Sequence, residues 1–114
     1  MKIAIAQLNP TIGNLTHNAE QILTAAQKAI DLGASVLLTP ELSLCGYPPR
    51  DLLLHPSFIA QMEAQLLQSA QQLPSDLYVL VGTVDRNDRA SEKGGKALFN
   101  SIAVLHQGRV AEIF

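Results

Sequence analysis

SVLLTPE, residues 35–41, is the stretch that decides the fold of this 114-residue chain. Its short apolar run ends at Pro40, which indicates a buried strand closed by a turn. A similar apolar run at residues 2–8 and apolar side chains at helical spacing over residues 15–30 precede it. Strand, helix and strand within roughly forty residues are typical of a parallel crossover. The stretch therefore predicts an α/β domain.

The remainder of the chain extends this layered pattern. Residues 57–73 have apolar side chains at helical spacing, and residues 77–84 are interpreted as a third strand. Residues 98–105 and 109–114 predict two more strands, and Gly108 between them can take the positive φ of a tight hairpin turn. We therefore expect a sheet that mixes parallel and antiparallel strands, with helices on one face.

The composition excludes several functional classes. Hydrophobic residues make up 47% of the chain and charged residues 16%, which indicates a packed core. Eight basic and ten acidic residues give a net charge of -2 without a basic cluster, so a nucleic-acid partner is excluded. The apolar runs are shorter than the roughly 18–20 residues that cross a membrane, and the first is too short for a signal peptide. One cysteine excludes an internal disulfide, so we expect one cytoplasmic domain without a membrane partner.

Glu41 is the first candidate for chemistry because it directly follows the strand of the opening stretch. Ligands of open α/β sheets gather at the carboxyl ends of the strands. A carboxylate there is expected to be partly withdrawn from water, an environment that suits proton transfer. The alternative is a surface glutamate that caps a turn or pairs with Arg50. Position alone leaves both interpretations open.

Several collinear motifs resemble the nitrilase (carbon–nitrogen hydrolase) superfamily. They are the strand at 33–38 before Pro40 and Glu41, the opening KIAIAQLNP at 2–10, and LFNSIAV at 98–104 before a glycine turn. GYPPRDLLL, residues 46–54, is more specific and is similar to the glutaminase domains of the glutamine-dependent NAD synthetases. The resemblance covers the whole chain. It implies that residues 1–114 are the N-terminal, incomplete portion of such a domain, the first part of a nitrilase-type α-β-β-α sandwich.

The resemblance also implies a Glu–Lys–Cys triad, in which Glu41 matches the Glu as general base. The Cys attacks the side-chain amide of glutamine, the Glu accepts the thiol proton and the Lys stabilises the oxyanion. In the family that Lys and Cys follow the hairpin, so we expect both beyond this segment. Lys93 and Lys96 precede the hairpin and are interpreted as solvated surface charges. Cys45 is interpreted as a small buried residue and not as the nucleophile.

Tyr47 is the second candidate site residue. In the family the aromatic residue after this glycine lies near the glutaminase pocket, where its phenol can orient the substrate. Packing against the prolines at 48 and 49 is an equal alternative. His17, His55 and His106 are scattered without the spacing of metal ligands, so we expect no metal site.

For the intact protein, the resemblance implies hydrolysis of glutamine to glutamate and ammonia. The ammonia would serve the ATP-dependent amidation of nicotinic acid adenine dinucleotide to NAD. The expected partners are glutamine, a C-terminal synthetase domain and further copies in a homo-oligomer. ATP and Mg²⁺ are expected in the synthetase domain and no cofactor in this segment, which alone is expected to be inactive. The alternatives are a free-standing nitrilase-family amidase or carbamoylase, and an inactive fragment that serves only as a fold or interaction module.

Overall fold

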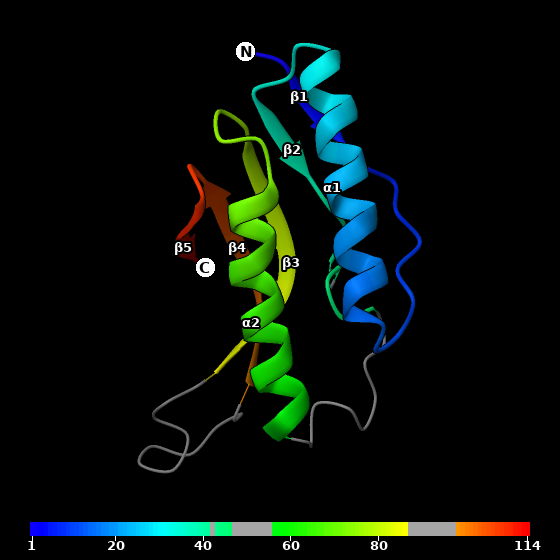
Figure 1. Cartoon of the computed structure of the whole chain (residues 1–114), viewed down its shortest axis with the longest axis vertical. Helices are drawn as coiled ribbons and strands as arrows, with labels where there is room; N and C mark the ends of the chain where they lie inside the picture. The colour runs from blue at the N-terminus through cyan, green and yellow to red at the C-terminus, as the bar shows by residue number, and fades with distance from the viewer. Residues whose placement is uncertain (42, 47–55, 87–97) are drawn as a thin grey trace.

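The computed structural model of the chain describes residues 1–41, 43–46, 56–86 and 98–114. Two helices lie next to each other along a twisted sheet (Figure 1). The elements in chain order are β1 (Ile3–Ile5), α1 (Leu15–Asp31), β2 (Val36–Leu38), α2 (Pro56–Gln72), β3 (Tyr78–Arg86), β4 (Leu98–His106) and β5 (Arg109–Ile113). The order of elements expected from the sequence is therefore confirmed. Neither helix is long and apolar enough to cross a membrane within these described ranges.

The five strands form one sheet in the order β1-β2-β3-β4-β5. β1, β2 and β3 are parallel, whereas β4 and β5 add to β3 as antiparallel neighbours. This confirms the mixed sheet. The β4–β5 hairpin turns at Gln107 and Gly108, whose φ angles of 53° and 75° suit the tight turn that matches strand twist. Pairing continues past β5, because Ile102 and Phe114 exchange two backbone hydrogen bonds of 3.1 and 2.8 Å.

β1 is shorter than the apolar run at residues 2–8 that predicted it. Its ladder with β2 covers three residue pairs and one further hydrogen bond of 2.9 Å, from Ala6 N–H to Leu38 C=O. The next β2 residue facing β1 is Pro40, which has no N–H to donate. The proline that ends β2 therefore also limits β1.

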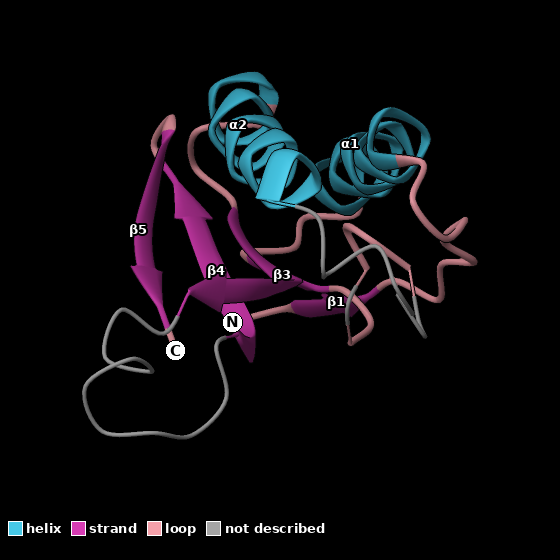
Figure 2. Cartoon of the chain, turned by 90° about the horizontal axis from the view of Figure 1, so that it is seen from below, coloured by secondary structure: helices cyan, strands magenta, loops and turns pink. Residues whose placement is uncertain are grey.

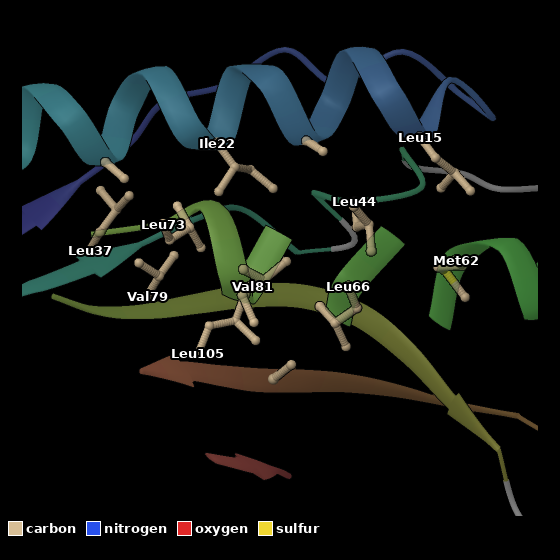
Figure 3. Close-up of a cluster of buried hydrophobic side chains, with 14 of the residues drawn as sticks. Leu15, Ile22, Leu37, Leu44, Met62, Leu66, Leu73, Val79, Val81 and Leu105 are labelled. Carbon is tan, nitrogen blue, oxygen red and sulfur yellow. The ribbon is translucent and has the colours of Figure 1, made fainter. Parts of the chain in front are cut away.

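Both helices cover the same face of the sheet (Figure 2). The core between the layers is built from aliphatic side chains of α1, α2 and the strands that these helices cover (Figure 3). Its most completely buried large members are Ile22, Leu37, Leu44, Met62, Leu77, Val79, Val81 and Leu105. Helices on one face of the sheet were expected and are confirmed.

The opposite face of the sheet is not covered by any described residue. Ile5 is 73% exposed, Ile102 46% and Phe114 71%, although all three are apolar. The described residues thus form one helical layer on one sheet. The two further layers of an α-β-β-α sandwich stay a prediction.

Candidate functional site

Glu41 lies in the turn that directly follows β2, where the sequence placed it. It borders a hollow of about 390 Å³ on the face of the sheet away from the helices. Three adjacent strand regions and the C-terminal residue form this hollow. Its lining residues are Leu38, Thr39, Pro40, Glu41, Leu80, Gly82, Ser101, Ile102 and Phe114. A carboxylate is thus presented at the rim of a mostly apolar recess, which is the kind of place where a small ligand binds.

The Glu41 side chain is exposed. The expectation that this carboxylate is partly withdrawn from water is therefore not met within the described residues. The physical reason is the uncovered sheet face, because nothing among these residues lies over the hollow from the solvent side. Strand-end position could be predicted from the sequence, whereas shielding from solvent depends on what packs over the sheet.

Two hydroxyl groups bracket Glu41 in the turn. Thr39 Oγ1 and Ser43 Oγ lie 2.7 Å apart, and Thr39 Oγ1 also donates a 2.8 Å hydrogen bond to the Leu80 carbonyl. Because the Thr39 hydroxyl hydrogen is used on Leu80, the Ser43 hydroxyl donates to Thr39. The backbone N–H of Gly82 donates to Ser43 Oγ at 3.2 Å. The turn that bears Glu41 is thereby attached to the middle of β3.

Asn18 of α1 holds the same turn from the other side, and the sequence interpretation did not include it. Its Oδ1 accepts from Thr11 N–H at 2.7 Å, and its Nδ2 donates to the carbonyls of Thr11 and Leu44 at 2.8 and 2.9 Å. Asn18 is fully buried, at 0% exposure. A signal was available, since Asn18 interrupts the apolar stripe of α1 between Leu15 and Ile22. An amide at a core-facing helix position predicts specific buried partners.

Gly46 brings the end of the turn against the segment before α1. Its φ is +84°, and a Cβ at this position would lie 2.8 Å from the Ile12 Cα atom. A hydrogen bond of 2.9 Å from Gly13 N–H to the Cys45 carbonyl lies beside this contact. The close approach of two backbones requires glycine here.

Cys45 is fully buried, which confirms its interpretation as a small core residue. Burial raises the pKa of the Cys45 thiol from 9.0 to about 11. A backbone hydrogen bond lowers the same pKa, but by less than burial raises it. The thiol therefore stays protonated at neutral pH and is a poor nucleophile.

The other sequence candidates that the structure describes do not line the hollow beside Glu41. Several further candidates lie outside the described residues, namely Tyr47, Arg50, His55, Lys93 and Lys96. His17 is 3.1 Å from the Gln21 amide nitrogen, and His106 stacks on Tyr78 with ring centroids 3.7 Å apart. Within the described ranges, no three His, Cys, Asp or Glu side chains gather in a way that could hold a metal ion.

The model of the carbon-nitrogen hydrolase family matches residues 2–112. The chain belongs to the carbon–nitrogen hydrolase family. It is 52% identical over 112 residues to the glutamine-dependent NAD(+) synthetase of Synechocystis sp., an alignment that covers 98% of this chain and 20% of that relative. The resemblance stated from the motifs is thus confirmed. The chain spans about a fifth of the length of this relative.

Solved structures in the family share the fold. The glutamine-dependent NAD+ synthetase of Acinetobacter baumannii, in complex with adenosine diphosphate, matches with a TM-score of 0.77 at 32% identity. That match covers 98% of this chain and 20% of the synthetase. An amidase of the nitrilase superfamily from Nesterenkonia AN1 matches with a TM-score of 0.76 at 22% identity, over 100% of this chain and 42% of the amidase. The arrangement of helices and strands is therefore common to synthetase and amidase members.

Proposed function

We propose that residues 1–114 are part of the glutaminase domain of a glutamine-dependent NAD synthetase. In the complete protein this domain would hydrolyse glutamine to glutamate and ammonia. The ammonia would amidate nicotinic acid adenine dinucleotide to NAD in an ATP-dependent step. The observation that carries the proposal is the 52% identity, along nearly the whole chain, to a synthetase of this name. Glu41 at the rim of the hollow supports it, because the chemistry needs a carboxylate beside a small-molecule recess.

In this reaction Glu41 acts as the general base. It accepts the proton of a cysteine thiol while the sulfur bonds to the amide carbon of glutamine. It then returns the proton to the departing nitrogen, so that the C–N bond breaks and ammonia leaves a thioester. Water hydrolyses the thioester to glutamate and frees the thiol. A lysine stabilises the oxyanion at each addition step.

The nucleophile and the oxyanion lysine come from outside residues 1–114 in this proposal. Cys45 is unsuitable as the nucleophile because it is buried on the core side of the turn, whereas Glu41 is exposed. Lys93 and Lys96 are given no role in the proposal. Tyr47 would orient the glutamine side chain through its phenol group.

The complete protein would hold its nucleotide chemistry in a synthetase part outside this segment. ATP and Mg²⁺ would bind there, and the adenosine diphosphate of the Acinetobacter baumannii synthetase supports a nucleotide site in such proteins. We further propose a cytoplasmic homo-oligomer, in which ammonia passes from the glutaminase part to the synthetase part.

The test replaces Glu41 by Gln in the complete protein. The amide keeps the shape of the side chain but cannot accept a proton, so NAD synthesis from glutamine should be lost while synthesis from added ammonia survives. Glu20→Gln is the matched control, because Glu20 is an exposed glutamate of α1. It should leave both activities unchanged. Equal loss of both activities in Glu41→Gln would instead show a structural role.

A free-standing amidase or carbamoylase is the second candidate, because the Nesterenkonia amidase shares the fold. The two candidates differ in their need for ATP. The complete protein is given nicotinic acid adenine dinucleotide, ATP, Mg²⁺ and ammonia in one assay, and an amide substrate without ATP in a second. Formation of NAD supports the synthetase, whereas amide hydrolysis without any NAD formation supports the amidase.

A further inference from the structure

Asn18 is a polar side chain in a place that ordinarily takes an apolar one. It lies on the core-facing stripe of α1 between Leu15 and Ile22 and is completely buried. Burying an amide costs free energy unless its polar atoms find partners. Asn18 uses both of its donors and one acceptor site, all three on backbone groups. The Asn18 side chain therefore fixes the position of backbone segments through hydrogen bonds, whereas its apolar neighbours only fill the core.

The three hydrogen bonds join two separate segments. Two of them hold Thr11 in the segment before α1, and the third holds the carbonyl of Leu44 in the turn after β2. The Gly13 to Cys45 hydrogen bond and the close approach of Gly46 to Ile12 lie beside it. Asn18 thus sets how far the turn after β2 stands from the body of the helix.

A short series of contacts connects Leu44 to Glu41. The Leu44 N–H donates to the Gly82 carbonyl at 3.1 Å, so Leu44 is held by β3 through its nitrogen and by Asn18 through its oxygen. One residue earlier, the Ser43 N–H donates to the Pro40 carbonyl at 3.1 Å and closes the turn around Glu41. Displacement of Leu44 would therefore displace the backbone that carries Glu41.

We propose that Asn18 is a positioning residue for Glu41, acting through the Leu44 carbonyl. This inference rests on the proposed function, in which Glu41 is the general base. A general base must lie within hydrogen-bond reach of the proton that it abstracts. A misplacement of about 1 Å can cost on the order of 10²-fold in rate. Asn18 does not touch the substrate in this account.

Two substitutions separate the roles of the amide. Asn18→Asp keeps the shape and an acceptor for Thr11 N–H but has no donor for the two carbonyls. Asn18→Leu keeps a similar volume and removes all three hydrogen bonds. The control is Leu73→Ala, which destabilises the same core. Leu73 is buried far from Leu44 along that core (Figure 3).

All variants are made in the complete protein, and NAD synthesis is measured from glutamine and from added ammonia. We expect both Asn18 variants to lose about tenfold or more in kcat with glutamine, with the KM for glutamine within about twofold of the unsubstituted protein. Ammonia-dependent synthesis should be retained. Leu73→Ala should lower the melting temperature but keep kcat with glutamine.

Two results would overturn the inference. One is a kcat with glutamine within about twofold of the unsubstituted value in both Asn18 variants. The other is a parallel loss of the ammonia-dependent activity, which would show general unfolding. Failure of the proposed function has a different signature: the unsubstituted protein would not use glutamine, or Glu41→Gln would keep its full rate.

Discussion

Replacing Gly46 by Ala tests how much the close approach of Gly46 to Ile12, beside the turn that bears Glu41, matters for stability. The new Cβ atom would lie 2.8 Å from Ile12 Cα and 2.9 Å from Ile12 N. Both neighbours are backbone atoms, so no side-chain rotation can relieve the overlap. The two segments would have to separate, and the hydrogen bond from Gly13 to Cys45 would lengthen.

Two terms contribute to the loss of stability. The left-handed backbone at φ +84° costs a non-glycine residue about 1–2 kcal/mol. Overpacking against a rigid neighbour costs about 1–3 kcal/mol more. The sum of about 2–5 kcal/mol is large against the roughly 5–15 kcal/mol that stabilises a typical domain.

Gly108→Ala provides a matched control within the same chain. Gly108 also has a left-handed φ, of +75°, but its added Cβ would meet no atom within 4 Å. Gly108→Ala should therefore lose only the stability that the left-handed backbone costs a non-glycine residue, without the cost of a steric overlap. The gain from restricting the unfolded chain is common to both substitutions and cancels in their difference.

Urea unfolding of the 114-residue chain, followed by far-ultraviolet circular dichroism, measures the difference. Gly46→Ala should unfold with a free energy about 1–3 kcal/mol lower than Gly108→Ala. With the urea dependence of about 1–3 kcal/mol per M that is typical of a small domain, this lowers the urea midpoint by about 0.3–3 M relative to the control. Equal losses in the two variants, within about 0.5 kcal/mol, would refute the conclusion that the Gly46–Ile12 approach constrains the turn.

Three further predictions concern Cys45. Burial raises the pKa of the Cys45 thiol from 9.0 to about 11. At pH 8 the folded chain therefore holds about 100-fold less Cys45 thiolate than the unfolded chain. Iodoacetamide should modify Cys45 in the folded chain at least about 100-fold more slowly than in the unfolded chain. The free energy of unfolding should also fall between pH 9 and about pH 11, because the thiol loses its proton at lower pH in the unfolded chain than in the folded chain. The same fall with pH in a Cys45→Ala chain would contradict this prediction. The 114-residue chain alone should release no ammonia from glutamine, and a rate that disappears in Cys45→Ala would contradict our account of this thiol.

The elements could be predicted because apolar spacing reports which side of an element is buried. In β3, for example, Val79 and Val81 are buried whereas Tyr78, the first residue of the strand, is exposed, as a two-residue period requires. The tight hairpin followed from Gly108 for a similarly local reason, the positive φ of its turn. Local chemistry was sufficient for both.

The contacts that hold the site could not be predicted in the same way. The amide of Asn18 bonds to Thr11, seven residues away, and to Leu44, 26 residues away. Helical spacing shows that Asn18 faces the core, but no pattern in one sequence tells which carbonyl it meets. The short length of β1 is similar, because Pro40 limits it from the neighbouring strand.

The exposure of Glu41 has the same cause as the exposure of the apolar sheet face. Ile102 and Phe114 line the hollow that Glu41 borders, and both are substantially exposed. A layer of structure packed over them would gain roughly 25 cal/mol for each Å² of apolar surface removed from water. That layer would also close over the hollow and withdraw the Glu41 carboxylate from solvent, which is the environment that proton transfer favours. Covering the hydrophobic face of the sheet and shielding the carboxylate that we propose as general base are therefore one structural step.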